Sequence, residues 1–337
     1  MSEVTDKELI KLRNSKAPWT EKYRPQKIED IIIDDNMSKK IKKIIYDKEM
    51  PNIILTGNPG SGKTSSILCV AKDLLGEHYE QGVLELNASD DRGIKAQDSI
   101  IYFCKKKLDL CSNDKNFSFH KIILLDEADN MTKKAQQLVS NLMEKYHNTT
   151  RFAFTCNNSS DIIEAIQSRC IIFRYRRLSP DQVLNRLQYI CKVENVPYDE
   201  EGINEIVNIS QGDMRQAINS LQVIYNGYNE INLENVYKLY DIPHPAIIKN
   251  IFIACKDKNI HDAIINLNIL RNKGYSSSDI CSSMINTIKA HNFNIIDEET
   301  KIKFLNEICA TSIIVNRGID TPLQLSGCVA KLCSKNL

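Results

Sequence analysis

Eight consecutive residues near the start of the chain have the types and spacing of a phosphate-binding loop. They follow an apolar run and read Gly57-Asn58-Pro59-Gly60-Ser61-Gly62-Lys63-Thr64, with Ser65 next in the same turn. Glycines let the backbone wrap closely, so that successive N–H groups point at phosphates, and a helix that starts at Gly62 adds its positive end. We expect the Lys63 ammonium to reach the β- and γ-phosphates and the Thr64 hydroxyl to ligate Mg²⁺.

A second apolar run, 122–125, ends in the adjacent carboxylates Asp126 and Glu127. Parallel α/β sheets place ligands at the carboxyl ends of their strands, so this pair and the loop belong at one edge. Asp126 would hold the same Mg²⁺ as Thr64, and Glu127 would orient and activate the attacking water. A chance glycine turn explains the loop alone, but not a loop combined with this second strand end. Together the two segments predict binding and hydrolysis of a nucleoside triphosphate.

Composition limits the classes of protein to consider. The 337 residues carry a net charge of +1, so any nucleic-acid binding must depend on a local patch of charge. No apolar stretch reaches the roughly 18 residues of a membrane span, and the N-terminal residues have no signal-peptide core. The 11 cysteines show no zinc-like spacing. They are typical of buried reduced thiols rather than of a disulfide framework.

Residues 17–175 alternate between short apolar runs and helix-length segments, which predicts an α/β domain with a parallel sheet covered on both faces. The expected strands are 53–56, 83–86, 121–126, 151–156 and 170–174, and the expected helices include 62–75, 94–108 and 132–145.

After Tyr175 the strand pattern stops. Ser179 and Pro180 have the types of a helix cap and first turn, and the apolar residues that follow recur at helical spacing. We therefore expect a small helical lid domain at 176–241, after a polar extension at 1–16 and the nucleotide-binding domain at 17–175. Prolines 243 and 245 mark a boundary, beyond which 242–337 again has helical periodicity and is expected to form an all-α collar for oligomerisation.

The order of motifs resembles the AAA+ ATPases, and most closely the small subunits of the eukaryotic clamp loader, replication factor C. Details of the chain resemble the roughly 40-kDa second subunit of this complex in animals. The resemblance covers about 17–334, and the matching segments are Pro18-Trp19-Thr20-Glu21-Lys22-Tyr23-Arg24-Pro25, Leu86-Asn87-Ala88-Ser89-Asp90-Asp91-Arg92-Gly93-Ile94, Leu125-Asp126-Glu127-Ala128-Asp129, Gln167-Ser168-Arg169-Cys170 and Gln211-Gly212-Asp213-Met214-Arg215-Gln216-Ala217.

The resemblance implies a role for five further residues. Asn157 resembles the first sensor, which holds the attacking water, although a turn asparagine has the same surroundings in sequence. Arg215 resembles the second sensor of the lid, with a solvated helix charge as the alternative. Arg169 resembles an arginine finger that acts in trans on a neighbouring subunit, with an intrachain salt bridge as the alternative. Tyr23 and Arg24 resemble the segment that covers the adenine, where a purely structural role is the alternative.

Two helices depart from the family pattern where it contacts DNA. Ser140 and Asn141 stand where an Arg-Arg pair is common, and an acidic Asp98 replaces an arginine. The remaining candidates for DNA phosphate contacts are Arg92, Lys95, Lys133 and Lys134, for which solvated helix ends are the alternative. The segment 97–103 faintly resembles a clamp-binding peptide, but an amphipathic helix that packs on its own sheet explains it as well.

The resemblance implies an ATPase subunit of a hetero-pentameric clamp loader in the nucleus. Its cofactors would be ATP and Mg²⁺, and its partners the other replication factor C subunits, the sliding clamp PCNA and primer–template DNA, with no membrane. DNA and clamp would stimulate turnover. Two alternatives remain open: a non-catalytic scaffold subunit that keeps its nucleotide, and another AAA+ DNA remodeller, which would usually end in a winged helix.

Overall fold

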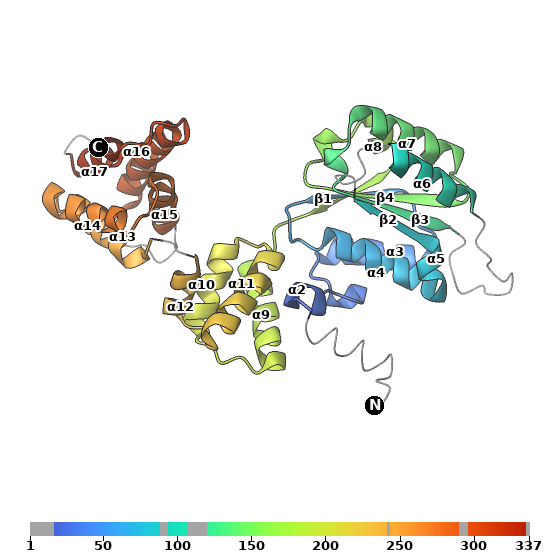
Figure 1. Cartoon of the computed structure of the whole chain (residues 1–337), viewed down its shortest axis with the longest axis horizontal. Coiled ribbons are helices and arrows are strands. Elements are labelled where there is room, and N and C mark those ends of the chain that lie inside the picture. Colours follow the sequence, from blue (N-terminus) through green and yellow to red (C-terminus); the bar gives the residue numbers. More distant parts are fainter. Residues whose placement is uncertain (1–16, 88–93, 107–119, 241–242, 290–295, 335–337) are drawn as a thin grey trace, which may run out of the picture. The chain divides into compact units, whose positions relative to one another are not determined.

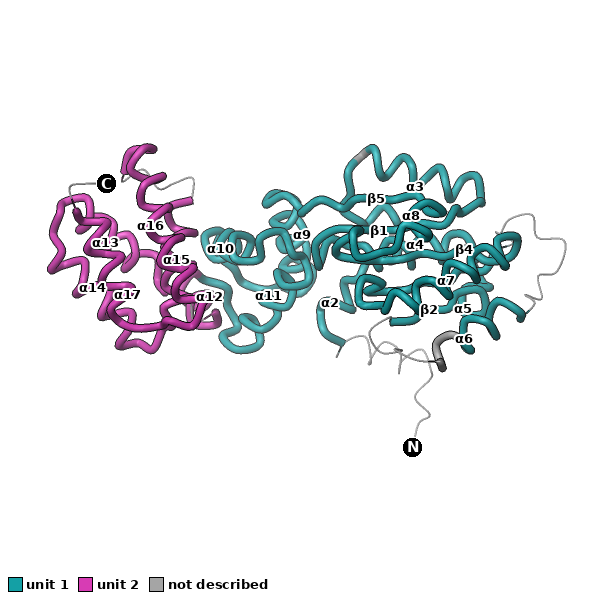
Figure 2. Tube along the Cα trace, turned by 90° about the horizontal axis from the view of Figure 1, so that it is seen from above, with its two compact units in different colours: residues 1–232 teal, residues 233–337 magenta. Residues whose placement is uncertain are grey.

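The computed structural model describes residues 17–87, 94–106, 120–240, 243–289 and 296–334. They form two compact units, 1–232 and 233–337, coloured separately in Figure 2. The units divide after Asn232, whereas the sequence placed a domain boundary at 241.

A five-stranded parallel sheet organises the first unit (Figure 1). Its strands are β1 (Ile53–Gly57), β2 (Val83–Asn87), β3 (Lys121–Asp126), β4 (Thr150–Cys156) and β5 (Ile171–Tyr175). Each expected strand is present, with ends that differ by at most one residue. The spatial order is β2-β3-β4-β1-β5, so β4 lies between the strands that carry the phosphate loop and the acidic pair. Sequence order alone does not give this arrangement.

Helices cover both faces of the sheet, as predicted. The helices of this part are α3 (Asp35–Asp47), α4 (Lys63–Leu75), α5 (Tyr79–Gly82), α6 (Ile94–Lys105), α7 (Lys133–Lys145) and α8 (Glu164–Gln167), with single 3₁₀ turns η1 (Ile28–Asp30), η2 (Gly76–His78), η3 (Ala128–Asn130) and η4 (Ser159–Asp161). One core joins α3 and α4 to the strands, and the other joins α6, α7 and α8 to them. Consecutive strand residues such as Leu124 and Leu125 point to opposite faces of the sheet and belong to different cores.

A buried lysine closes the end of α6. Lys121, 4% exposed, donates from Nζ to the carbonyl oxygens of Phe103, Cys104 and Lys106 at 2.6, 2.7 and 2.6 Å. These three carbonyl groups lie at the helix end, where they lack intrahelical partners, and a cation there also suits the helix dipole. The helix ends at Lys105 in the described residues, and positions 107 and 108 of the expected helix 94–108 lie outside them.

The lid consists of α9 (Pro180–Glu194), α10 (Glu200–Ser210) and α11 (Met214–Tyr228). Ser179 caps α9 in a capping box with Gln182, and Pro180 occupies the first turn, as its sequence indicates. A short helix near the N-terminus, α2 (Trp19–Lys22), packs against α11. The Trp19 ring stacks on Tyr225 with 5.8 Å between ring centroids, and the backbone N–H of Trp19 donates to Oε1 of Gln222. The N-terminal segment is thus attached to the lid.

The second unit is helical throughout its described residues, in line with the prediction. Its helices are α12 (Leu233–Tyr240), α13 (Pro245–Lys256), α14 (Ile260–Asn272), α15 (Ser277–Lys289), α16 (Glu298–Asn316) and α17 (Pro322–Cys333). Their core contains Phe252, Met284 and Phe304. All ten cysteines in the described parts of both units are free thiols. Within those parts, no helix combines the length and the apolar character that crossing a membrane requires.

Candidate functional site: a nucleotide pocket between sheet and lid

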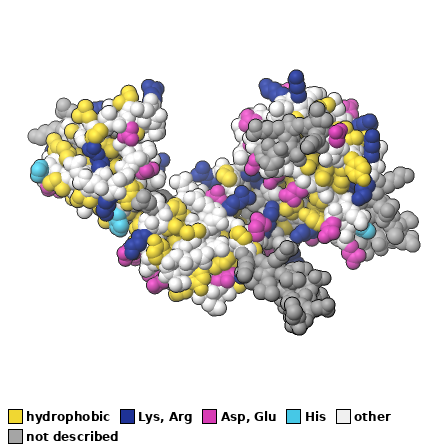
Figure 3. Space-filling model, in the orientation of Figure 1, with side chains coloured by type: hydrophobic (Ala, Val, Ile, Leu, Met, Phe, Trp, Pro, Cys, Tyr) yellow, Lys and Arg dark blue, Asp and Glu magenta, His cyan; other side chains and the backbone are white. Residues whose placement is uncertain are grey.

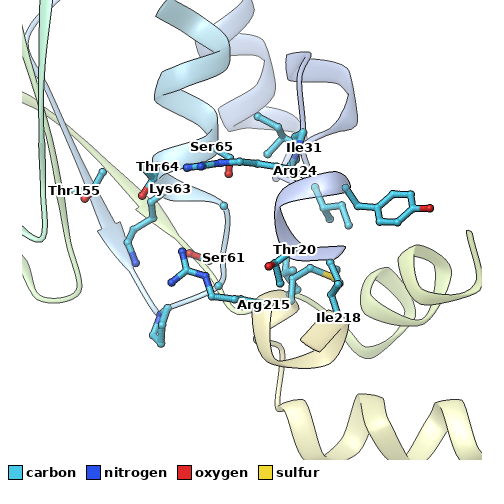
Figure 4. Close-up of a pocket in the computed structure, with 18 of the residues that line it drawn as sticks. Thr20, Arg24, Ile31, Ser61, Lys63, Thr64, Ser65, Thr155, Arg215 and Ile218 are labelled. Atoms are coloured by element: carbon cyan, nitrogen blue, oxygen red, sulfur yellow. The ribbon is translucent and has the colours of Figure 1, made fainter. Parts of the chain in front are cut away.

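A pocket of about 220 Å³ lies in the first unit, where β1, β3 and β4 end and the lid begins (Figure 4). Most of the residues predicted for the site line it: Tyr23, Arg24, Pro59, Gly60, Ser61, Gly62, Lys63, Thr64, Ser65, Asp126, Glu127, Asn157 and Arg215. Gly57 and Asn58, also predicted, belong to the same loop and accept hydrogen bonds from Lys63. These predicted residues therefore lie together at one site in the structure.

The phosphate loop depends on glycine at two positions. Gly62 precedes the first residue of α4 with φ of 91°, and Gly60 has φ of 66°, a region that other residues reach only with strain. A Cβ on Gly60 would lie 1.8 Å from Oδ1 of Asp213, the residue whose side chain caps the N-terminus of α11. The loop and the lid helix are thus in direct contact, which the sequence did not indicate.

Replacing Gly60 with alanine is expected to weaken nucleotide binding about tenfold, since left-handed backbone costs a non-glycine residue roughly 1–2 kcal/mol and the added carbon displaces the start of α11. Asp213 cannot turn away cheaply because its Oδ1 accepts the Gln216 N–H at 3.0 Å. Calorimetric titration with ATP measures the change. The control is Gly227→Ala, where a Cβ meets nothing within 4 Å. A dissociation constant within twofold of wild type would show that this contact does not matter.

Lys63 is held at the base of the pocket. Its Nζ donates to the carbonyl oxygens of Gly57 and Asn58 at 2.6 and 2.9 Å and to Oδ1 of Asn157 at 3.1 Å. Burial lowers the pKa of the Lys63 ammonium, while the neighbouring Cys156 and carboxylates oppose that shift. A bound polyphosphate would oppose it further, because opposite charge favours the protonated form. Lys63 and Asn157, the predicted first sensor, are therefore in direct contact at the base of the pocket.

Oxygen atoms suited to Mg²⁺ meet between α4 and β3. The Thr64 Oγ1 lies 3.1 and 3.3 Å from the two carboxylate oxygens of Asp126. Hydroxyl and carboxylate oxygens are the ligands that Mg²⁺ takes alongside substrate phosphates, so these two residues fit the metal. Glu127, the next residue, is exposed to the pocket, and one of its carboxylate oxygens accepts a hydrogen bond from Asn130 at 3.2 Å.

Two residues that the sequence analysis did not assign support this centre. Asp129 accepts the backbone N–H of Asn157 at 3.0 Å, which fixes the predicted sensor at the end of β4. Thr155 places its hydroxyl between Asp126 and the backbone of Glu127. Asp129 ends the segment Leu125-Asp126-Glu127-Ala128-Asp129, but the sequence did not indicate its partner. Nothing in the sequence around Thr155 marked it.

The lid contributes Arg215 to the pocket, and the N-terminal segment contributes Tyr23 and Arg24. Figure 4 shows the Arg215 guanidinium directed toward the phosphate loop near Ser61, and Arg24 extended toward Thr64 and Ser65. Arg215 is exposed, at the start of α11. These positions are compatible with the family roles, in which both segments close over a nucleotide.

Tyr23 is oriented by the lid. Its hydroxyl donates to Glu194, which also pairs with Lys22 at 2.5 Å, and Arg186 donates to the Tyr23 carbonyl oxygen at 2.9 Å. Burial and the neighbouring Glu194 carboxylate raise the pKa of Tyr23. The tyrosine hydroxyl therefore faces α9, and this structural role exists alongside any contact with a base.

Arg169 lies outside the pocket. It follows α8, donates to the Ala165 carbonyl oxygen at 2.7 Å and pairs with Glu144 at 3.4 Å. The Arg169 and Glu144 side chains are 39% and 71% exposed, so solvent screens this pair. The intrachain salt bridge considered from the sequence is present, and it leaves the guanidinium accessible at the surface.

The DNA candidates are only partly described. Lys133 and Lys134 are exposed at the start of α7, next to the capping residue Thr132. Arg92 lies outside the described residues, as does the side chain of Lys95. On the face shown in Figure 3, Lys and Arg side chains are interspersed with acidic ones. Among the described residues on that face, basic charge is not gathered into one patch.

The two departures on α7 differ in exposure. Ser140 is buried, at 2% exposure, whereas Asn141 is exposed. In the segment 97–103 on α6, which faintly resembles a clamp-binding peptide, Ile100 and Phe103 belong to the core and are only 2% and 9% exposed. Tyr102 is 73% exposed. Packing of α6 on its own sheet thus accounts for the two buried residues.

Comparison with known proteins covers nearly the whole chain. The AAA model (ATPase family associated with various cellular activities) matches 53–178, the RCF1/5-like AAA+ lid model matches 185–225, and the replication factor C C-terminal domain model matches 243–331. The RuvB Holliday junction branch migration motor of Thermotoga maritima shares the fold, with a TM-score of 0.52 at 17% identity over 68% of this chain and 79% of that one.

Curated relatives match along almost their full length. A probable replication factor C subunit 2 of Dictyostelium discoideum is 46% identical over 94% of this chain and 92% of the relative. Replication factor C subunit 4 of Saccharomyces cerevisiae is 44% identical over 97% and 99%. The match in Schizosaccharomyces pombe, also subunit 4, is 44% identical over 95% and 92%. With a nucleotide pocket built from the AAA motifs, a lid and a helical C-terminal unit, the chain belongs to the replication factor C family of AAA ATPases.

Proposed function

We propose that this chain is an ATP-hydrolysing subunit of a hetero-pentameric clamp loader, which opens the sliding clamp PCNA and loads it onto primer–template DNA in the nucleus. The observation that carries the proposal is the convergence of Lys63, the Thr64–Asp126 pair, Asn157 and Arg215 on one pocket. Relatives with 44–46% identity that span the same length are named replication factor C subunits.

Binding depends on the loop and the lid. The glycine-rich backbone and the N-terminus of α4 receive the phosphates, and Lys63 supplies a positive charge beside them. Thr64 and Asp126 would hold Mg²⁺, which neutralises phosphate charge when bound. Arg215 reports the occupied pocket to the lid, because it extends from α11 toward the phosphate loop. The close approach of Gly60 and Asp213 also couples the position of the phosphate loop to that of α11.

Hydrolysis depends on the acidic pair and the sensor. Glu127 lies at the end of β3 beside the pocket and would orient and deprotonate the attacking water. Asn157 would hold that water by its side-chain amide, while Asp129 holds the Asn157 backbone. Arg169 lies outside its own pocket, so in this proposal it completes the site of a neighbouring subunit. Turnover would then require assembly, and DNA and clamp would stimulate it by aligning neighbouring subunits.

Reconstitution of the five-subunit assembly tests the function. With this chain present, we expect ATP turnover to rise when clamp and primed DNA are added together, and clamp to be recovered on the DNA. An assembly that lacks this chain should do neither. Unprimed single-stranded DNA serves as the control for DNA structure. Turnover that ignores clamp and primed DNA, with no clamp loaded, would contradict the proposal and leave a nucleotide-binding scaffold.

A further inference from the structure

One threonine hydroxyl connects the two acidic residues of the site. Strands β3 and β4 are parallel, with Leu125 opposite Phe154, so the next residue on each strand places Asp126 beside Thr155. The Thr155 Oγ1 accepts the backbone N–H of Glu127 at 3.2 Å and donates to Oδ1 of Asp126. The residue is 1% exposed and lines the pocket, and Figure 4 shows it near Thr64 and Lys63.

Both hydrogen bonds act on residues that the proposed reaction uses. A threonine hydroxyl has one proton and accepts through its lone pairs, so Thr155 can serve the carboxylate and the amide together. The Thr64 hydroxyl also contacts this carboxylate, at 3.1 Å from Oδ1 and 3.3 Å from Oδ2. Two hydroxyl groups therefore contact the carboxylate, and together they restrict its rotation.

The second hydrogen bond acts on strained backbone. Glu127 has φ of 53° and ψ of 44°, a left-handed conformation that is strained for a non-glycine residue. Such a conformation persists only where the surrounding structure holds it. The hydrogen bond from the Glu127 N–H to Thr155 is one of those constraints, and it fixes where the Glu127 side chain leaves the backbone.

We propose that Thr155 is a positioning residue for ATP hydrolysis, whose hydroxyl holds Asp126 and Glu127 in their working orientation. This inference rests on the proposed function for its effect on turnover, but not for its effect on the backbone. The competing explanation is that Thr155 only fills space in β4. Valine has nearly the same shape without the hydroxyl, and serine keeps the hydroxyl without the methyl group, so the two substitutions separate these explanations.

In the reconstituted assembly, Thr155→Val is expected to lower kcat at this site about tenfold or more, with KM for ATP within about twofold, because alignment and not binding is lost. Thr155→Ser is expected to stay within about threefold of the wild-type kcat. The matched control is Thr150→Val, at the other end of β4, where the side chain is also 1% exposed. Its kcat should equal that of wild type.

Amide hydrogen exchange of Glu127 in the full-length chain provides a readout that needs no turnover. Without the hydroxyl acceptor, this amide should exchange at least about tenfold faster in Thr155→Val, but not in Thr155→Ser or Thr150→Val. Should Thr155→Val not fold, Thr155→Ala takes its place with the same expectations.

The proposal is overturned if the valine variant keeps its kcat within threefold, if serine is as damaging as valine, or if Glu127 exchange does not change. If Lys63→Ala also leaves turnover unchanged, the site is idle and the proposed function fails. In that case the exchange experiment still decides whether Thr155 holds this backbone.

Discussion

Lys63→Ala is expected to reduce ATP turnover at this site on the order of 10²-fold, because it removes a preorganised positive charge from the place where phosphate charge develops. The side chain is fixed by three oxygen acceptors, so no other residue moves into its position at low cost. The measurement is ATP hydrolysis by the assembly with clamp and primed DNA, together with the dissociation constant of ATP for the chain.

The matched control for Lys63 is Lys72→Ala on the same helix. Lys72 also carries a positive charge and hydrogen-bonds to a side chain, Gln26 at 2.6 Å, but it does not line the pocket. We expect its turnover to equal that of wild type. If Lys63→Ala hydrolyses ATP and loads clamp as wild type does, the nucleotide at this site is structural, and the scaffold alternative replaces the catalytic one.

Arg169→Ala is expected to lower turnover at a neighbouring subunit by on the order of 10³-fold, the scale of a lost arginine finger, while ATP binding to this chain stays within twofold. The guanidinium is outside its own pocket and accessible, so its effect should appear only in the assembly. The measurement is ATP turnover in a series of assemblies. In each of them, one of the other subunits has the only active site and the remaining sites are inactivated.

Stability separates a finger from a structural arginine. The ion pair of Arg169 with Glu144 is exposed, so its loss should cost the chain no more than about 1 kcal/mol. Arg174→Ala, an exposed arginine on β5, is the control for removing a nearby charge. A large fall in unfolding temperature, with no neighbouring site affected, would assign Arg169 to the intrachain salt bridge alone.

Most of the correct predictions from the sequence depended on patterns of residues that are close together along the chain. The phosphate loop is contiguous, its glycines need no distant partner to be recognised, and the strand before and the helix after it follow from apolar runs and spacing. Ser179 with Pro180 likewise predicted the start of α9, because capping involves residues only a few positions apart. The lysine at the end of α6 could not be identified in this way, because Lys121 lies 15 residues beyond Lys106, whose carbonyl group it contacts.

By itself, then, the sequence determined the five strands, the helical lid and second unit, and the loop and acidic pair of the pocket, since each depends on neighbours along the chain. Only the tertiary structure decided which distant side chains complete the site. Insertion of β4 between β1 and β3 brings Thr155 to Asp126, and lid packing brings Asp213 to Gly60 and Glu194 to Tyr23. Hydrogen bonds and close contacts between residues 29 to 171 positions apart depend on strand order and packing, which no local spacing encodes.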